Sequence, residues 1–370
     1  MLKKILDKLP KKISPQEISE HDLQEQVKTA LAEKSALYIQ GGNSKAFYGN
    51  TVNAKYSLNV SKHTGIVDYT PSELCLTVCA GTRITDLEAE LASNQQMLPF
   101  EPPIFSETAT IGGTIAAGLA GPRRPYSGSV RDAVLGMKII NGKGEIISFG
   151  GQVMKNVAGY DVTRLMTGSL GTLGVILEVS IKVIPKPLVD TTIVLPYSHE
   201  EAINYFTSLR TSGLPISASC YVDDQVYIRL SGSKNQLSNL LKKESWQVHD
   251  NGDAFWQSIR NQTHDFFQQQ DKPLWRLSVS PSSPASAQLN TDNLIEWGGG
   301  LRWVASNTPA NIVNSIAKKK GGSATLFRGN IPEVQTFPTP EPALFSIYKR
   351  LKHNLDPSRI FNPDRMYKGL

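Results

Sequence analysis

The strongest constraint on the fold of this 370-residue chain is a stretch rich in glycine and alanine at residues 108–128, T-A-T-I-G-G-T-I-A-A-G-L-A-G-P-R-R-P-Y-S-G. It contains five glycines and four alanines and no acidic residue. Glycine has no Cβ and permits positive φ angles, so another group can approach such a backbone closely. Two further clusters, G-G-N-S-K at residues 41–45 and G-S-L-G-T-L-G at residues 168–174, each adjoin a predicted strand.

The length of the chain favours two domains, each large enough to bury its own core. Apolar residues make up 40% of the sequence, and no apolar run reaches the ~18 residues that indicate a membrane span. The basic start, M-L-K-K-I-L-D-K-L-P-K-K, is interrupted by an aspartate and a proline before an apolar signal-peptide region can form. We therefore expect a cytoplasmic protein without a transmembrane segment.

Charge and cysteine content argue against several functional classes. The net charge is +6, but the basic residues are scattered and no basic stripe alternates with aromatic residues, so we expect no nucleic-acid partner. Three cysteines are fewer than the four thiolates that usually hold an iron–sulfur cluster, and the six histidines include no H-x-x-H or H-x-x-x-H pair. We therefore expect no metal site. Cys75 and Cys79, in the apolar run L-C-L-T-V-C-A, are predicted to be core thiols.

Periodicity divides the chain into three parts. Up to residue 189, short β-rich runs alternate with small-residue turns. Residues 190–330 begin with a strand and the capping box S-H-E-E at 198–201, and their mixed helices and strands suggest a ferredoxin-like α+β sandwich. Residues 331–370 begin with a proline-rich linker, followed by an amphipathic helix at 344–355 that we expect to pack back on the first domain.

The glycine clusters have the chemistry of an anion site. A glycine turn can aim successive main-chain N–H groups at a phosphate. Thr110-Ile111-Gly112-Gly113, at the start of a predicted helix, would add the positive end of the helix dipole. The fingerprints G-x-x-x-x-G-K-[ST] and G-x-G-x-x-G are absent, so the site is neither a P-loop nor a Rossmann site. The alternative is that the glycines serve only tight turns and close helix packing.

Longer motifs extend the pattern over nearly the whole chain. They are Q-G-G-N-S-K-A-F-Y-G (40–49), M-L-P-F-E-P-P (97–103), A-G-L-A-G-P-R-R-P-Y-S-G-S-V-R-D (117–132), F-G-G-Q-V-M-K-N-V-A-G-Y-D (149–161), W-G-G-G-L-R-W (297–303) and L-D-P-S-R-I-F-N-P-D-R-M (355–366). With these motifs the sequence resembles the FAD-binding subunits of glycolate oxidase (glycolate dehydrogenase), within the vanillyl-alcohol-oxidase-type flavoproteins. The resemblance implies an α+β fold: a PCMH-type FAD-binding domain of two α+β subdomains at 1–189, a smaller ferredoxin-like α+β cap domain at 190–330, and a linker and C-terminal segment at 331–370.

The resemblance also implies which residues bind FAD. Gly41 to Lys45 would wrap the pyrophosphate with main-chain N–H groups, and residues 110–113 would hold its other side. Backbone near Val175 would face the adenine, and Asn362 with residues 155–161 would lie toward the flavin. Acidic side chains within residues 108–128 would repel a diphosphate, which accounts for their absence. The full set of implied FAD-binding residues is Gly41, Gly42, Asn43, Ser44, Lys45, Thr110, Ile111, Gly112, Gly113, Gly118, Gly121, Gly128, Asp132, Val175 and Asn362.

No catalytic residue can be assigned by the resemblance. Catalytic D-2-hydroxy acid dehydrogenases of the superfamily resemble one another in an H-x-G-D-G-N-x-H motif, which is absent around all six histidines here. The family's G-S-E-G-T-L-G is G-S-L-G-T-L-G, with Leu170 in place of a carboxylate, and F-N-P-G-R is F-N-P-D-R. Asp364 therefore occupies a turn position where glycine would adopt a positive φ more readily.

The resemblance implies a subunit of a multi-subunit complex that oxidises glycolate, a small 2-hydroxy acid, to glyoxylate. A sister FAD subunit would carry the histidine motif, and an iron–sulfur subunit would take the electrons onward. The complex would also be the route to any peripheral association with the inner membrane face. Two alternatives stay open: a non-catalytic assembly scaffold that keeps the FAD fold, and a stand-alone FAD-dependent hydroxy acid or alcohol oxidoreductase.

Several other side chains have more than one interpretation. Arg123 and Arg124 either offset phosphate charge, dock an acidic partner or are ordinary exposed arginines. Arg276 and Arg302 are candidates for holding a substrate carboxylate. A bulky residue in place of Gly112 is expected to abolish flavin retention with only a modest loss of fold. The tryptophans that alternate with the two candidate arginines fit the core of the second domain better than a flavin platform; they are Trp275, Trp297 and Trp303.

Overall fold

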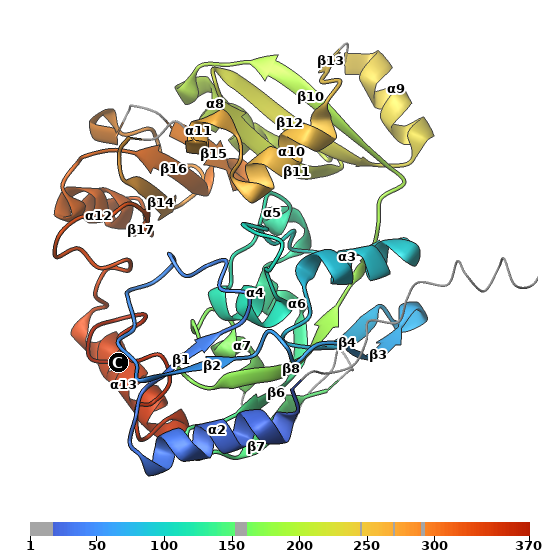
Figure 1. Cartoon of the computed structure of the whole chain (residues 1–370). Coiled ribbons are helices and arrows are strands. Elements are labelled where there is room, and N and C mark those ends of the chain that lie inside the picture. Colours follow the sequence, from blue (N-terminus) through green and yellow to red (C-terminus); the bar gives the residue numbers. More distant parts are fainter. Residues whose placement is uncertain (1–17, 152–160, 245, 269–270, 290–292) are drawn as a thin grey trace, which may run out of the picture.

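The structure, a computed structural model, describes residues 18–151, 161–244, 246–268, 271–289 and 293–370. Two units lie one above the other in Figure 1. The lower unit contains a five-stranded antiparallel sheet, in the order β3 (Ile66–Thr70), β4 (Cys75–Cys79), β8 (Val175–Lys182), β6 (Val134–Ile140) and β7 (Ile146–Gly150). It also contains the parallel pair β1 (Leu37–Gln40) and β2 (Tyr56–Asn59), the pair β5 (Gln96–Met97) and β9 (Ile184–Pro185), and the helices α2 (Glu20–Ala32), α3 (Ile84–Ser93), α4 (Ile111–Ala117), α5 (Arg124–Ser127), α6 (Val130–Ala133) and α7 (Val162–Met166).

The core of the lower unit follows from the apolar runs of its strands. All five residues of β4 are buried, so Cys75 and Cys79 are core thiols, as predicted. The helix α2, which no sequence motif indicated, begins at a capping box formed by Ser19 and Asp22. It buries one apolar face against the sheet-based core through Leu23, Val27 and Ala30.

The upper unit contains a single eight-stranded antiparallel sheet. Its strands lie in the order β13 (Gln247–Val248), β10 (Val189–Pro196), β12 (Gln225–Gly232), β11 (Ile216–Val222), β15 (Asn293–Glu296), β16 (Leu301–Ala305), β14 (Leu274–Ser278) and β17 (Ser323–Arg328). Its described helices are α8 (His199–Leu209), α9 (Lys234–Glu244), α10 (Gly252–Asn261), α11 (Asp265–Gln268) and α12 (Ala310–Lys319). The predicted capping box, Ser198 with Glu201, does begin α8.

This sheet is two ferredoxin-like units side by side. In the first half, β10, α8, β11, β12, α9 and β13 follow one another as β-α-β-β-α-β, and the four strands have the spatial order 4-1-3-2. The second half, β14 to β17, has the order 2-3-1-4, with α12 before its last strand. Antiparallel pairing of β11 with β15 joins the halves. The ferredoxin-like architecture expected from the sequence is therefore present, and it is doubled.

The last helix, α13 (Pro342–Leu355), lies against the lower unit (Figure 1). Its residue Lys352 is buried, and Nζ donates hydrogen bonds to the carbonyl oxygens of Thr172 (2.6 Å) and Phe361 (2.7 Å) and to Asp356 Oδ2 (2.8 Å). The chain then returns beside β1, where Phe361 and Leu37 form a parallel bridge. The amphipathic tail helix expected from the sequence is thus present and is tied to the lower unit by a buried lysine.

Glu101 is the main polar link between the two units. It lies in the lower unit, and its carboxylate accepts two hydrogen bonds from Arg229 Nη2 of β12, at 2.8 and 2.9 Å. The backbone N–H and Nε of Arg123 donate to the same carboxylate at 3.0 and 3.1 Å. Arg123 is buried in this ion pair and therefore has neither of the binding roles that its sequence suggested.

Two further side chains link the units and fix how they face each other. Arg260 of α10 donates from Nε to the carbonyl oxygen of Pro102 (2.8 Å) and forms an ion pair with Glu88 of α3. The indole N–H of Trp297, at the end of β15, donates to the carbonyl oxygen of Gly121 (3.0 Å). In Figure 1, α10 of the upper unit lies above α5 of the lower unit. Across the described ranges, no helix is both long and apolar enough to cross a membrane.

Replacing Glu101 with glutamine tests this link. The variant leaves Arg229 and Arg123 buried without their carboxylate, so we expect the free energy of unfolding to fall by about 3–5 kcal/mol. Burial raises the pKa of Glu101, but Arg229 and Arg123 outweigh burial and hold the pKa below its ordinary value. The ion pair therefore stabilises the fold fully at pH values above the ordinary pKa of a glutamate. This contribution is lost as the pH falls through the lowered pKa of Glu101.

Urea unfolding followed by tryptophan fluorescence, at neutral pH and below pH 4.5, measures both effects. The exposed Glu107, six positions further along, provides the matched control: Glu107→Gln should unfold like the unaltered protein. Equal stability of Glu101→Gln and Glu107→Gln would remove Glu101 from its proposed structural role.

Candidate cofactor site

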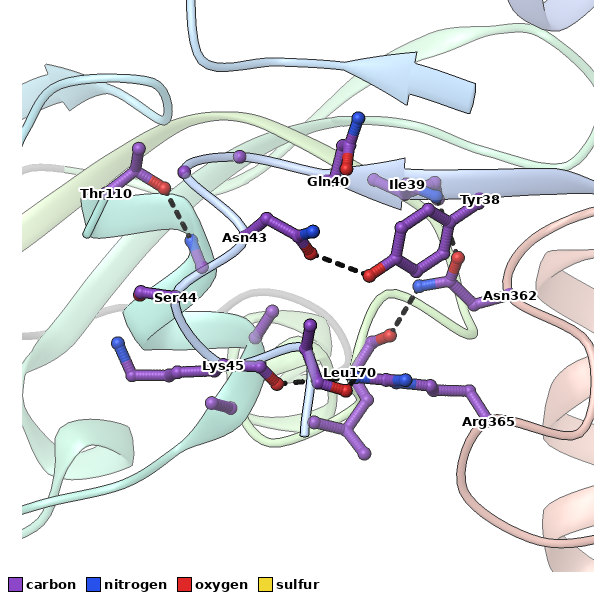
Figure 2. Close-up of a pocket in the computed structure, with 16 residues that line it drawn as sticks. Tyr38, Ile39, Gln40, Asn43, Ser44, Lys45, Thr110, Leu170, Asn362 and Arg365 are labelled. Atoms are coloured by element: carbon purple, nitrogen blue, oxygen red, sulfur yellow. Dashed lines mark hydrogen bonds between the residues drawn. The ribbon is translucent and has the colours of Figure 1, made fainter. Parts of the chain in front are cut away.

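A pocket forms where four segments of the lower unit meet (Figure 2). They are the end of β1 with the turn after it, the start of α4, the loop at residues 168–174 and the segment after α13. All four segments carry motifs noted in the sequence: the first three carry the glycine clusters, and the last carries F-N-P-D-R. The lining residues are Tyr38, Ile39, Gln40, Gly41, Gly42, Asn43, Ser44, Lys45, Ala46, Thr110, Gly113, Ala116, Ala117, Leu170, Asn362 and Arg365.

The turn at residues 41–45 is held by close backbone packing. A Cβ on Gly42 would overlap the carbonyl oxygen of Thr108, and a Cβ on Gly41 would overlap Thr110 Oγ1. Thr108 Oγ1 also donates a hydrogen bond to the Gly42 carbonyl oxygen (2.6 Å). Asn43 has a φ of +56°, and its side-chain oxygen accepts a hydrogen bond from the Tyr38 hydroxyl (2.7 Å). Both glycines are therefore required by the packing of the turn.

The turn presents a row of main-chain donors without partners. Within the described part of the chain, no N–H group from Gly41 to Lys45 donates a hydrogen bond to another protein atom. Successive N–H groups around a left-handed residue form a concave anion site, and Asn43 supplies that left-handed residue here. The residues present therefore suit a phosphate or diphosphate group.

The helix on the opposite wall has a different role from the one expected. Thr110 caps α4, but the first N–H groups of the helix are already used: Ile111 donates to Thr82, Gly112 to Ala80 and Gly113 to Thr110 Oγ1. The wall therefore contributes close packing rather than free donors. A Cβ on Gly112 would lie 2.6 Å from Ala80 Cβ, so a bulky residue there should also disrupt the fold, contrary to the modest effect expected from the sequence.

The segment after α13 closes the pocket. Asn362 accepts a hydrogen bond from the Ile39 N–H (2.8 Å) and donates one to the Leu170 carbonyl oxygen (2.7 Å), so it joins β1 to the glycine loop. The guanidinium of Arg365 donates to the carbonyl oxygens of Lys45, Ala46, Tyr48 and Asn50. These bonds, two of which are drawn in Figure 2, orient the chain after the glycine turn of residues 41–45.

Sequence reasoning selected Asn362 but missed Arg365. The F-N-P-D-R motif was the available signal, since it contains both residues. The unusual aspartate of that motif, Asp364, has a φ of +61°, so it does adopt the left-handed conformation that glycine would favour. Its carboxylate accepts a hydrogen bond from the Gly369 N–H (2.6 Å), which holds the turn.

Lys45 is the cation of the pocket. Its ammonium lies 3.5 Å from Thr114 Oγ1 and 5.8 Å from the centroid of the Phe105 ring. No carboxylate pairs with it among the described residues. Burial, with a smaller effect from the positive Arg260, lowers the pKa of Lys45 to about 8. An anion bound at the turn would relieve this cost because it would pair with the ammonium group.

A second hollow lies on the other side of the glycine turn. It shares Gln40 to Asn43 and Thr110 with the first pocket, so the turn forms a common wall. A third recess shares Gln40, Gly41 and Thr110 with both hollows and reaches Val60, Ala80 and Ile176. An elongated molecule with its anionic centre at the turn would fit these connected spaces. The residues that line only the second hollow are Asn59, Ser61, Lys62, Thr64, Gly81, Thr82, Arg83, Asp86 and Thr108.

Several residues implied by the resemblance lie away from these spaces. Ile111 and Val175 are fully buried in the core. Gly118 packs on Gly168, and the Gly121 N–H donates to Phe100. Their cofactor roles, and those of Gly128 and Asp132, stay predictions. Asp132 accepts hydrogen bonds from Ser129, the N-cap residue of α6, and Gly128 packs against Asp132.

The remaining candidates divide between structural and undescribed positions. Lys155 and Tyr160 lie outside the described residues, and Asp161 caps α7. Arg302 donates to the carbonyl oxygens of Ser283 and Pro284, so it is a structural residue and not a ligand for a substrate carboxylate. The three tryptophans are buried in the upper unit, as predicted: Trp275, Trp297 and Trp303.

Comparisons with known proteins show the family and the fold of this chain. Residues 18–150 match the FAD binding domain family. The chain is 45% identical over 348 residues to the glycolate oxidase subunit GlcE of Escherichia coli (strain K12), covering 94% of this chain and 97% of that protein. It is 36% identical over 137 residues to the glycolate oxidase subunit GlcD of Bacillus subtilis (strain 168), covering 37% of this chain and 29% of that protein. The crystal structure of p-cresol methylhydroxylase with substrate bound has a TM-score of 0.70 at 15% identity, covering 93% of this chain and 86% of that one.

The fold is of the PCMH and vanillyl-alcohol-oxidase type, and the match to the FAD binding domain family defines an FAD-binding protein. Because the similarity to GlcE extends over nearly the full length of both proteins, the chain belongs to the family of glycolate oxidase subunits represented by GlcE. The FAD cofactor expected from the sequence is therefore confirmed at the level of the family.

Replacing Lys45 with glutamine tests the cation of the pocket. Loss of a charge-assisted hydrogen bond should weaken FAD binding by about tenfold or more. The pKa of Lys45 is about 8 without a ligand, and a bound anion raises it. Above pH 8, FAD binding is therefore coupled to the uptake of a proton by Lys45. The affinity of the unaltered protein should therefore fall as the pH rises from 8, and the affinity of Lys45→Gln should not.

Quenching of flavin fluorescence on titration with FAD measures these affinities. The exposed Lys349 of α13 supplies the control, and Lys349→Gln should match the unaltered protein at every pH. A Lys45→Gln variant with unchanged affinity and unchanged pH dependence would show that Lys45 does not contact the diphosphate.

Proposed function

We propose that this chain is an FAD-binding subunit of a multi-subunit glycolate oxidase, which oxidises the 2-hydroxy acid glycolate to glyoxylate. The observation that carries the proposal is the glycine turn of residues 41–45, with a row of unpartnered N–H groups beside the uncompensated cation of Lys45. The family membership gives this anion site its ligand, since the related proteins are FAD-linked oxidoreductases of hydroxy acids.

The residues of the pocket have separate tasks in this proposal. The N–H groups of Gly41 to Lys45 and the Lys45 ammonium hold the diphosphate of FAD. Thr110 and Gly113 form the wall behind it, and Asn362 with Arg365 keeps the turn in register with β1. When bound, FAD supplies the oxidising equivalent: glycolate loses two electrons and two protons to become glyoxylate.

A base for the hydroxyl proton of glycolate is not found among the residues of the pocket. No histidine lines it within the described part of the chain, and the buried His63 lies beside Ile18 and Glu20 instead. We therefore assign the chemistry of the hydroxyl group to a sister FAD subunit that carries a histidine motif. The flavin of this chain then either relays electrons or stabilises the complex.

The onward path of the electrons requires another partner. The cysteines of this chain are buried and dispersed over two units, at Cys75, Cys79 and Cys220. An iron–sulfur cluster usually needs four thiolates, so we assign the cluster to a separate iron–sulfur subunit. The assembly would be cytoplasmic and would reach the inner membrane face only through its partner subunits.

The visible absorbance spectrum of the purified subunit tests the proposal. We expect a flavin spectrum with one FAD per chain, because the anion site is complete within this chain. Anaerobic glycolate should leave the spectrum of the lone subunit unchanged and should bleach it when the sister subunit is added. The Lys45→Gln variant, purified in parallel, shows how much flavin depends on the pocket.

The other results point to the two alternatives. A colourless protein that also fails to bind added FAD would contradict the proposal and favour an assembly scaffold. Bleaching of the lone subunit by glycolate would show that this chain is a complete hydroxy acid oxidoreductase, and a base would then have to be sought within it.

A further inference from the structure

A contiguous aromatic cluster extends from the FAD pocket across the interface to the sheet of the upper unit. Phe105 and Phe47 belong to the lower unit, and Phe327 and Trp303 belong to the upper one. Neighbouring ring centroids are 5.4 Å apart for Phe105 and Phe47, 5.4 Å for Phe47 and Phe327, and 4.8 Å for Phe327 and Trp303. Beyond Trp303, the Arg276 guanidinium contacts both Trp303 and Trp297.

Four cations lie over the rings of this cluster and of the adjacent Trp297. One is Lys45 of the FAD pocket, and the other three are arginines from α5, β14 and β17. The shortest distances from cation to ring centroid are 5.8 Å for Lys45 over Phe105, 5.4 Å for Arg328 over Phe47, 5.1 Å for Arg276 over Trp297 and 4.4 Å for Arg124 over Trp297. A cation over a ring is attracted to its face, but the N–H groups at the edge of a guanidinium stay available to an anion.

Three of these cations, the arginines, are not held in ion pairs by any described residue. Within the described ranges, the guanidinium groups of Arg124, Arg276 and Arg328 make no ion pair and no hydrogen bond. The other arginines at the interface are fully engaged: Arg229 binds Glu101, and Arg260 binds Glu88 and a carbonyl oxygen. The contrast separates arginines that hold the fold from arginines that the fold leaves unpaired.

Arg124 and Arg276 come together at one indole ring. Both guanidinium carbons lie close to the Trp297 centroid, so they can be no further apart than the sum of 4.4 and 5.1 Å. Desolvation and the neighbouring positive charge of Arg276 lower the pKa of Arg124, and their effect outweighs that of the Asp132 carboxylate, which acts in the opposite direction. Two cations that repel one another at a partly buried site are stabilised when an anion binds between them.

Two carboxylates act on this pair, Asp132 on Arg124 and Glu296 on Arg276, but neither forms an ion pair or a hydrogen bond with these guanidinium groups among the described residues. Glu296 is buried and accepts a hydrogen bond from the Trp303 indole N–H (2.8 Å) rather than from Arg276. Burial raises the pKa of Glu296 to about 7, although Trp303 and Arg276 act in the opposite direction. Glu296 is therefore not a full counter-charge for two arginines near neutral pH.

We propose that Arg124 and Arg276, held against Trp297, bind the carboxylate of a small organic acid at the interface of the two units. The inference rests on the proposed function, because it places a carboxylate-bearing ligand of that complex on this chain. A guanidinium binds a carboxylate through two parallel N–H donors, and stacking on the indole fixes the orientation of that fork. The two residues come from different units, so the site exists only when the units are docked.

The position of Arg276 favours a small ligand over a protein segment. Arg276 is half-buried, in a strand flanked on both sides by β16 and β17, and its neighbours Trp297 and Trp303 are buried. Only Arg124 of the pair is exposed. A small acid can contact both guanidinium groups, whereas an acidic surface of a partner would meet Arg124 first.

Equilibrium dialysis of the purified full chain against radiolabelled glycolate tests the site. We expect saturable binding that Arg276→Gln and Arg124→Gln each weaken by about tenfold or more. Arg276→Lys keeps the charge but not the fork, so it should recover only part of the affinity. The exposed Arg350 of α13 provides the control, and Arg350→Gln should bind glycolate like the unaltered chain. Glycolamide, which is uncharged, should not compete.

The FAD content of every sample, read from its visible spectrum, separates this inference from the proposed function. A colourless chain whose glycolate binding depends on Arg276 would contradict the proposed function and support the carboxylate site. Three results would overturn the site: no glycolate binding by the unaltered chain, equal binding by Arg276→Gln, or equal competition by glycolamide. Unchanged glycolate binding by Arg124→Gln with loss of partner-subunit copurification would assign Arg124 to an acidic protein surface instead.

Discussion

The buried ion pair of Lys352 and Asp356 is the interaction on which the cofactor pocket depends. An ammonium group that leaves water must be fully hydrogen-bonded, and Lys352 achieves this with two carbonyl oxygens and one carboxylate. One of those carbonyl groups belongs to Thr172 of the glycine loop and another to Phe361 beside β1. The same pair therefore fixes three segments at once and delivers Asn362 and Arg365 to the pocket.

The charged groups between the two units fall into two kinds: those held in ion pairs and those without an ion-pair partner among the described residues. Where the chain needs rigidity, as at Glu101 with Arg229 and Arg123, each buried charge has its counter-charge and its hydrogen bonds. Along the aromatic cluster from Lys45 to Arg276 the cations form no ion pairs with the described residues. An uncompensated cation costs free energy in the unliganded protein, and a bound anion recovers it. FAD and an organic acid, both anions, would therefore bind next to these unpaired cations.

Local sequence information predicted the parts of the site that depend on local conformation. The glycine turn at residues 41–45 and the helix that begins after Thr110 follow from residue type and spacing. The left-handed conformation of Asp364 did not, because aspartate adopts a positive φ less readily than glycine. Long-range contacts were not accessible in the same way. Nothing near Arg365 in the sequence indicates that it binds the carbonyl oxygens around Ala46, and nothing near Gly112 shows that its N–H is already bonded to Ala80. The doubled ferredoxin-like plan was also hidden, because its two halves share a topology without a sequence repeat.

The pocket has a consequence for the order of events during protein synthesis. Arg365 and Lys45 are 320 residues apart, yet the guanidinium of Arg365 binds the backbone of the glycine turn. The ribosome releases the glycine turn long before it makes the residue that orients it. The FAD-binding unit is therefore interrupted by the whole of the upper unit, which must fold while the lower one waits for its final segment. Flavin loading should accordingly be a late, post-translational event that a prematurely terminated chain cannot complete.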